Sequence, residues 1–347
     1  MSIPAAISKG RTGFLVVLFS LFLASVILVS LSLGYLHIPT TDILRILVGR
    51  VSGHEPLIQG VDPTFTTIIL DVRLPRILTC AIVGGGLALS GVLFQGILLN
   101  PLADPYTLGV SAGAAFGASI AILLNLGATF VSVPAFAFVG ACLTLLIVIF
   151  LSYSSKNPSA ALSSNNLILS GIIVAAILSA GISFLKFVAN EQVSVIIFWL
   201  MGSFASKTWA NVLVVLVFLF FSAVIALYFA RDLNLISLGS KAAISLGVDQ
   251  KKITFVLLIT GSLLAGACVS VSGIIGFVGL LVPHMVRFIT GPDNRSLIPL
   301  SMLAGGGLLL TADTITRAVL PHEIPIGVLT ALIGGPVFCW IFKKSKL

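Results

Sequence analysis

No charged side chain occurs between Asp104 and Lys156, and several other stretches of the chain are equally apolar. A helix that crosses a bilayer core of roughly 30 Å needs about 20 apolar residues. A barrel strand needs only about 10 residues and alternates apolar with polar positions, which these runs do not. Because backbone polar groups in lipid must be satisfied internally, such runs fold as helices. The sequence therefore predicts an all-α polytopic membrane protein.

The composition agrees, with 58% hydrophobic and 9% charged residues among 347, whereas charged residues make up about 25% of soluble domains. The net charge of +8 reflects loop Lys and Arg rather than a nucleic-acid surface. The cysteines lie inside apolar runs without CxxC spacing, and the histidines show no ligand spacing, so we expect packing or structural roles and neither a metal nor a cofactor. These residues are Cys80, Cys142, Cys268, Cys339, His37, His54, His284 and His322.

We expect a single transmembrane domain over residues 1–347 with ten spans. Two of the boundaries between neighbouring spans fall within uncharged stretches, and we place them at the turn residues 125–127 and 272–273. An even number of spans places both termini on one side of the membrane. The predicted spans are 14–34, 77–98, 106–124, 128–152, 165–186, 210–230, 253–272, 274–289, 297–318 and 325–342.

The distribution of Lys and Arg predicts the orientation, because cytoplasmic loops collect basic residues. With both termini inside, the polar loop 231–252 is cytoplasmic, and Arg73, Arg76 and Arg317 are basic groups at outer helix ends. The outer set is completed by Arg45, Arg50, Lys186 and Lys207. The other twelve of the 19 basic residues are cytoplasmic: Lys9, Arg11, Lys156, Arg231, Lys241, Lys251, Lys252, Arg287, Arg295, Lys343, Lys344 and Lys346.

Two outer segments are predicted to be more than turns. In the external loop 34–72, Thr40 and Thr41 are candidate caps of a short amphipathic helix. Its apolar side chains would be Ile43, Leu44, Ile46 and Leu47. Residues 193–204, VSVIIFWLMGSF, are too short to span and predict a helix in the outer surface, with Trp199 and Trp209 as interface anchors.

The presence or absence of sequence motifs distinguishes between several possible classes of function. The chain contains no GxxxxGK[ST] phosphate loop, so any ATP must be hydrolysed by a partner. An ion-coupled secondary transporter would hold ionisable groups near the bilayer midplane; the embedded candidates here are Asp313 and Arg317, whose i,i+4 spacing predicts an intrahelical ion pair. A membrane-embedded enzyme is a third alternative, although no nucleophile-base set or HExxH motif occurs.

A set of ordered motifs resembles a known family. RLPR at 73–76 is followed by GxxLxxSGxxxQxxxxNPLADPxxLGVSxGAxxG over 84–117. Further along come WLMGSF, LGSKAAISLGV, SGIIGFVGLLVPHMVR, ADTITR and EIPIGVLTALIGGPVF. Together they cover nearly everything after the first span, and the chain resembles the FecCD-type permeases of type II ABC importers.

The resemblance implies a ten-helix permease in the bacterial inner membrane that works as a homodimer. Its partners would be two cytoplasmic ATPase subunits, an extracytoplasmic substrate-binding protein and membrane lipid. The chain would itself be no enzyme. Its cargo would be a metal chelate, an iron(III)-siderophore before haem or cobalamin.

The resemblance also assigns roles at the outer end. The two RLPR arginines, Arg73 and Arg76, and Arg317 at the close of the ninth span would meet acidic side chains of the binding protein. Guanidinium groups suit such contacts because they bind carboxylates in a bidentate manner. Asp313 would be a structural partner that orients Arg317. The alternative for these arginines is a stop charge or a ligand of lipid phosphate.

At the cytoplasmic end the resemblance implies a gate formed by Asn100, Leu102, Ser164 and Asn165. Small polar side chains suit release of a polar cargo, although Ser and Asn are also ordinary at a helix start.

Within loop 231–252, the resemblance implies a short coupling helix that sits in a cleft of the ATPase. Its residues would include Leu238, Gly239, Ser240, Ala243, Leu246 and Gly247, with Ser240 as N-cap and both glycines allowing sharp turns. A generic basic cytoplasmic loop is the alternative.

Overall fold

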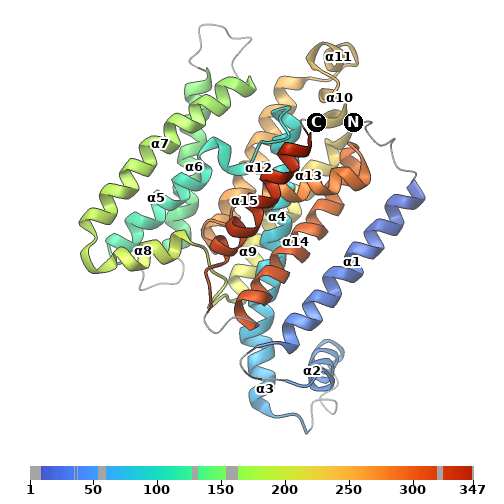
Figure 1. The fold of residues 1–347 in the computed structure, drawn as a ribbon, viewed down its shortest axis with the longest axis vertical. Coiled ribbons are helices and arrows are strands. Elements are labelled where there is room, and N and C mark those ends of the chain that lie inside the picture. Colours follow the sequence, from blue (N-terminus) through green and yellow to red (C-terminus); the bar gives the residue numbers. More distant parts are fainter. Residues whose placement is uncertain are drawn as a thin grey trace.

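The computed structural model describes residues 9–34, 36, 38–53, 60–126, 132–153, 163–318 and 323–345, and every regular element in these ranges is a helix (Figure 1). The predicted all-α class is confirmed. Each of the ten predicted spans corresponds to one helix. In order, these are α1 (Lys9–Ser32), α4 (Leu74–Ile97), α5 (Val110–Leu123), α6 (Ser132–Tyr153), α7 (Ser164–Val188), α9 (Trp209–Tyr228), α12 (Gln250–Ser272), α13 (Val278–Thr290), α14 (Asn294–Ala318) and α15 (Ile326–Ser345).

Seven of these helices are long and apolar enough to cross a membrane, and three apolar helices are shorter, at Val110–Leu123, Val278–Thr290 and Ile326–Ile341, within the described ranges. The predicted span 274–289 was therefore too long at its start. Residues 273–277 are non-helical, and α13 has 13 residues, which rise only about 20 Å. Non-helical backbone at this depth is tolerated where it lines a cavity or is buried in protein.

The segment predicted as an external loop is largely helical, with α2 (Thr40–Ser52), α3 (Pro63–Thr67) and the π-helix η2 (Ile68–Arg73), which runs directly into α4. The amphipathic helix is confirmed, since α2 buries Ile43 and Ile46 while Leu44 is exposed. The predicted threonine cap is wrong, because the N-cap residue is Pro39 and no side chain caps it.

Helix α4 lies at the centre and packs against α14, α12, α13 and α9. Its glycines make this possible: a Cβ atom on Gly91 would collide with the carbonyl of Gly279, and one on Gly84 with the carbonyl of Gly305. Such close approach is typical of membrane helix interfaces built from small residues. Helices α5, α6 and α7 form a second group beside this centre, joined to it where α6 packs on α12 (Figure 1).

The short helices divide between the two ends of the bundle. Helices α10 (Ala230–Ile236) and α11 (Ser240–Ser245) lie at the end where α1 begins and α15 ends, while α2 and α3 lie at the opposite end (Figure 1). We call these the α11 end and the α2 end. The shared end agrees with an even number of crossings, and its assignment to the cytoplasm stays a prediction.

The remaining short elements are the 3₁₀ helices η3 (Pro105–Leu108) and η6 (Asn190–Gln192) and the α-helix α8 (Val193–Leu200), which matches the predicted surface helix.

Candidate functional site

At the α2 end, Arg73 and Arg317 both bind the carboxyl end of α1. Arg73 donates to the carbonyls of Leu31 and Leu36, and Arg317 donates to the carbonyls of Ser30 and Leu33, each at 2.7 Å. The last carbonyls of a helix lack intrahelical partners and attract cations. The two guanidinium groups therefore cap α1, and Arg73 is buried in doing so.

Glycine 34 makes room for both caps. A Cβ atom on Gly34 would lie 2.9 Å from Nη2 of Arg73 and 3.0 Å from Nη1 of Arg317. Any side chain at this position would push at least one guanidinium off the end of α1.

The third arginine forms an ion cluster with two carboxylates. Nε and Nη2 of Arg76 donate to both carboxylate oxygens of Asp313, at 3.1 and 2.8 Å, and Nη2 also donates to Glu323. Asp313 is thus a structural ion-pair partner as predicted, but its partner is Arg76 rather than Arg317. The intrahelical pair does not form because Arg317 turns toward α1.

A loop from Met201 to Thr208 lies beside this ion cluster. Its Ser203 and Phe204 line a cavity of about 240 Å³ together with Asp313 and Glu323. Lys207 in the same loop has no hydrogen bond or ion pair with any described residue; burial and, to a smaller extent, the charge of Arg76 together lower its pKa to about 8. Trp209, predicted as an anchor in the interface, donates to the carbonyl of Leu70 at 3.1 Å and so also ties α9 to η2.

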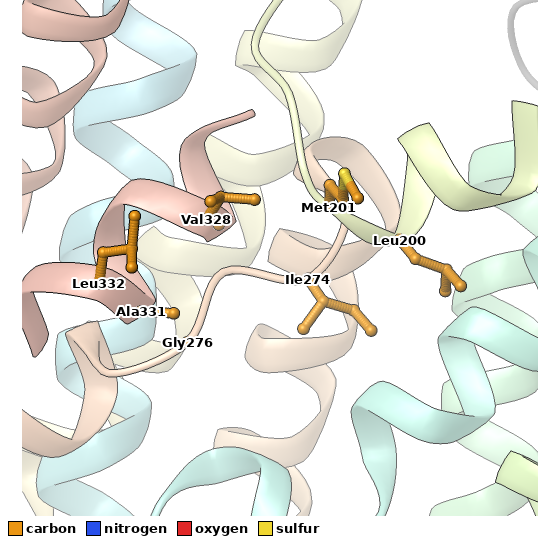
Figure 2. Close-up of a pocket in the computed structure, with 8 residues that line it drawn as sticks. Leu200, Met201, Ile274, Gly276, Val328, Ala331 and Leu332 are labelled. Carbon is orange, nitrogen blue, oxygen red and sulfur yellow. The ribbon is translucent and has the colours of Figure 1, made fainter. Parts of the chain in front are cut away.

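A larger cavity of about 550 Å³ opens between α8, the 273–277 segment and α15 (Figure 2). Its described lining carries no charged side chain and consists of Leu200, Met201, Ile274, Gly276, Gly327, Val328, Ala331 and Leu332. The 273–277 segment is fixed at both sides: the carbonyl of Ser272 accepts from Ser203 N at 2.8 Å, and the carbonyl of Ile275 accepts from the Tyr106 hydroxyl at 2.9 Å.

The predicted gate residues lie in two segments, the turn that precedes η3 and the first turn of α7. Asn100 Oδ1 accepts from the Leu102 N–H at 2.9 Å, and Leu102 is exposed. Ser164 begins α7, the side chain of Ser163 caps it, and Asn165 is exposed. The two segments are held together by packing between η3 and α7, where a Cβ atom on Gly171 would lie 2.7 Å from Leu108 Cα.

Asp104 stabilises the turn next to the predicted gate residues Asn100 and Leu102. Its side chain accepts from the Tyr106 N–H at 2.8 Å, and its own N–H donates to the Thr107 hydroxyl at 3.0 Å, which completes a capping box. Burial raises the pKa of the Asp104 carboxyl, and the hydrogen bond from the Tyr106 N–H opposes this, so that the pKa is about 6.

At the α11 end, a short helix forms where the sequence predicted one, as α11, Ser240–Ser245, and its role in coupling stays a prediction. Its N-cap is Gly239 (φ 103°), with no side-chain cap, so the prediction of Ser240 as N-cap is wrong. Its carboxyl end is a Schellman motif: Val248 N–H donates to Ala243 and Gly247 N–H to Ile244, with Gly247 at φ 82°. Both glycines are thus required by backbone conformation.

Helix α11 exposes apolar side chains. Leu238, Ile244 and Leu246 are 67%, 65% and 59% exposed, while Ala243 is fully buried and holds α11 against the bundle. A group of exposed apolar side chains on a projecting segment is typical of a protein interaction site.

Helix α10 connects α11 to the centre of the bundle. The side chain of Leu233 fits against Gly96 of α4, where a Cβ atom would lie 2.8 Å from it. Asn234 donates to Asp293 at 2.7 Å and accepts from the backbone and side chain of Asn294, at 2.9 and 2.8 Å, at the start of α14.

The chain matches the model of the FecCD transport family over residues 21–344. The chain belongs to this family, whose permeases are subunits of type II ABC importers. A 40% identical FecCD relative, over 84% of this chain and 78% of its own length, is the cobalamin import system permease protein BtuC of Halobacterium salinarum. Another, 38% identical over 95% of this chain and 96% of its own length, is the molybdate import system permease protein MolB of Haemophilus influenzae.

A FecCD-like fold is also found among solved structures. A metal-chelate type ABC transporter in an inward-facing conformation superposes with a TM-score of 0.82 at 35% identity, covering 95% of this chain and 98% of the other.

The sequence predictions did not include three residues that the structure brings into these sites: Glu323, Lys207 as the unpaired cation beside Arg76, and Asn234 as the link to α14. Glu323 had a detectable signal, since it is an acidic residue in the short connection between the ninth and tenth predicted spans.

Proposed function

We propose that this FecCD permease moves an iron(III)-siderophore across the bacterial inner membrane, as a homodimer driven by two cytoplasmic ATPase subunits and supplied by an extracytoplasmic binding protein. The observation that carries the proposal is the exposed apolar surface of α10–α11, placed at the end of the bundle shared by both chain ends. The chain has no phosphate loop of its own, so this surface is where a separate motor would act.

We call residues 230–247, which comprise α10, α11 and their flanking glycines Gly239 and Gly247, the handle. Its contacts suit it to transmit a displacement from a docked motor. Docking would bury Leu238, Ile244 and Leu246, each of which gains roughly 1.5–3 kcal/mol on full burial. Leu233 and Asn234 then connect the docked segment to α4 and α14, the two helices that carry the ion cluster at the other end. A displacement of α10 would therefore reach the centre of the bundle as a rigid-body movement.

The large cavity supports a cargo path that holds its cargo weakly. It is apolar, lies at the non-helical break between α12 and α13, and opens beside the exposed face of α15. A second copy of the chain would close that open side. We propose that the cargo passes between the two copies, along α7 and α15, toward the gate at Asn100, Leu102, Ser164 and Asn165.

The α2 end would receive the binding protein. Arg76 is the arginine best placed for this role, because its Glu323 contact is exposed, whereas Arg73 is buried at the end of α1. Arg317, partly exposed, would contribute charge while capping α1.

Reconstitution tests the proposal and its alternatives. Proteoliposomes containing the permease, its ATPase and the binding protein are expected to accumulate iron(III)-siderophore only with internal ATP, and a binding protein loaded with haem or cobalamin is the parallel assay for the alternative cargoes. Uptake by the permease alone that follows an imposed proton gradient would instead establish a secondary transporter. Uptake of haem or cobalamin in place of the siderophore would correct the cargo and leave the machine unchanged.

A further inference from the structure

Arg76 is shared by two carboxylates of very different exposure. The side chain of Asp313 is 1% exposed and binds both Nε and Nη2, whereas that of Glu323 is 44% exposed and binds Nη2 alone. Exposed ion pairs contribute little to stability, and buried bidentate pairs are held firmly. The Glu323 contact can therefore be exchanged while the Asp313 contact persists.

The exchangeable contact joins two helices. Glu323 lies three residues before α15, and its bond to Arg76 ties the start of α15 to α4. The first turns of α15 contribute Gly327 and Val328 to the wall of the 550 Å³ cavity. This exposed ion pair thus restrains the start of α15 relative to α4, alongside the hydrogen bond from Gly327 N–H to the Met201 carbonyl at 3.0 Å.

The donors of Arg76 limit what can be added. Nη2 carries two N–H groups, and both are engaged, one by Asp313 and the other by Glu323. A third carboxylate can therefore bind Nη2 only if one of the first two leaves it. Glu323 is the one that is already partly solvated.

We propose that, before docking, Glu323 occupies the position on Arg76 that an acidic side chain of the binding protein takes on docking. The incoming carboxylate takes the Glu323 position on Nη2 of Arg76 and gains the unpaired ammonium of Lys207. Glu323 turns into solvent, and the start of α15 is released from α4. This inference rests on the proposed docking of a binding protein at the α2 end.

The test measures docking of the purified binding protein to the complete permease–ATPase complex in nanodiscs. Glu323→Gln keeps the size of the side chain and removes its charge. Asp71→Asn is the matched control, because Asp71 is an exposed acid in η2 that forms no hydrogen bond or ion pair with Arg76, and its loss changes the net charge equally. We expect Glu323→Gln to lower the Kd about two- to five-fold, the range of an exposed ion pair, and Asp71→Asn to leave it unchanged.

A second readout follows α15 directly. An environment-sensitive fluorophore on Leu332→Cys, in a Cys339→Ser background, reports from the cavity wall. In the otherwise unchanged complex its emission should shift when the binding protein docks, and in Glu323→Gln the shifted emission should be present before docking.

The outcomes are distinct. Tighter docking and a pre-shifted fluorophore in Glu323→Gln support the exchange. Equal or weaker docking in Glu323→Gln, or the same gain in Asp71→Asn, overturns it while leaving the proposed function in place. If the binding protein fails to dock on the unaltered complex, the proposed function itself is overturned at this step, and the exchange with it.

Discussion

The two ends of the bundle are stabilised by different physics. At the α2 end, Arg73, Arg76 and Arg317 bind helix-end carbonyls or carboxylates in partly or fully buried positions. At the α11 end, the handle is shaped by the backbone conformations of Gly239 and Gly247, with exposed apolar side chains and few side-chain hydrogen bonds. The buried contacts hold the α2 end rigidly, whereas the exposed apolar side chains of the α11 end need a partner to bury them.

This contrast predicts which substitutions lower the stability of the fold and which impair the coupling of ATP hydrolysis to transport. Removing one member of a buried ion pair leaves an uncompensated charge, so substitutions at the α2 end should first affect folding. Substitutions in the handle expose little that is buried, so they should spare the fold and affect assembly and transport. Each prediction below changes one side of this comparison.

The largest effect is expected for Asp313→Ala. It leaves Arg76 partly buried with only the exposed Glu323 as partner, and loss of such a partner costs about 3–5 kcal/mol. Thermal or denaturant unfolding of the detergent-solubilised permease, followed by tryptophan fluorescence, measures the loss.

The double variant Arg76→Leu/Asp313→Leu is the control for that prediction. Because an apolar pair of similar size often replaces a buried ion pair at little cost, it should recover most of the stability while lacking docking of the binding protein. If Asp313→Ala unfolds at the same denaturant concentration as the unaltered chain, the charges at this end do not hold the bundle together.

The next effect concerns the handle and is predicted for Gly239→Val. Gly239 has φ 103° and ψ 151°, a region that only glycine adopts easily and that costs other residues about 1–3 kcal/mol. No described atom lies within 4 Å of a Cβ atom placed there, so only the local backbone changes. We expect the variant to insert into the membrane normally and to keep the stability of the bundle. ATP hydrolysis should be uncoupled from uptake of the cargo.

A β-branched residue on the regular part of α11 serves as the comparison. Ser245→Val lies in the helix and should keep uptake close to normal, while Gly247→Val, at φ 82°, should behave like Gly239→Val. Normal uptake in both glycine variants would remove α11 from the coupling role.

How far the sequence predicts this comparison depends on the range of the interactions. The spans and the handle follow from local patterns, since apolar runs and a Gly-bounded polar segment can be recognised residue by residue. The ion cluster is non-local: Arg76 meets Asp313 only after α4 packs on α14. The i,i+4 spacing indicated Arg317 instead, and nothing in that spacing reveals that Arg317 finds the free carbonyls of α1.

The predictions of the two N-cap residues were wrong for a related reason. Thr40 and Ser240 are good N-cap types, yet Pro39 and Gly239 hold those positions, because the entering chain direction and a glycine conformation fix where each helix starts. The shortening of α13 depends on contacts of the 273–277 segment with Ser203 and Tyr106, which are distant in sequence.

A smaller effect is expected for Ile244→Ser, which makes the handle polar without touching its backbone. Ile244 is 65% exposed, so stability should change by less than about 0.5 kcal/mol, as at other surface positions. Binding of the ATPase should weaken by about tenfold, corresponding to roughly 1.4 kcal/mol of lost apolar burial. Titration of ATPase onto the permease in nanodiscs measures it, and unchanged affinity would place the motor elsewhere.

The smallest predicted effect is a pH dependence at the α2 end. Burial, with a further contribution from Arg76, lowers the pKa of Lys207 to about 8, so its ammonium is charged at pH 7 and mostly neutral at pH 9. A carboxylate that docks beside it loses that attraction as the pH rises through about 8, and docking should weaken by no more than about five-fold, the scale of a partly exposed pair.

Lys207→Met is the control: it should dock at pH 7 as weakly as the unaltered complex does at pH 9 and should lack the step near pH 8. Titrations of the binding protein itself occur equally in both complexes, so only the difference between the two profiles reports on Lys207. Superimposable profiles would mean that the arriving carboxylate meets Arg76 alone, and the charge contrast between the two ends would then rest on the arginines without a contribution from the lysine.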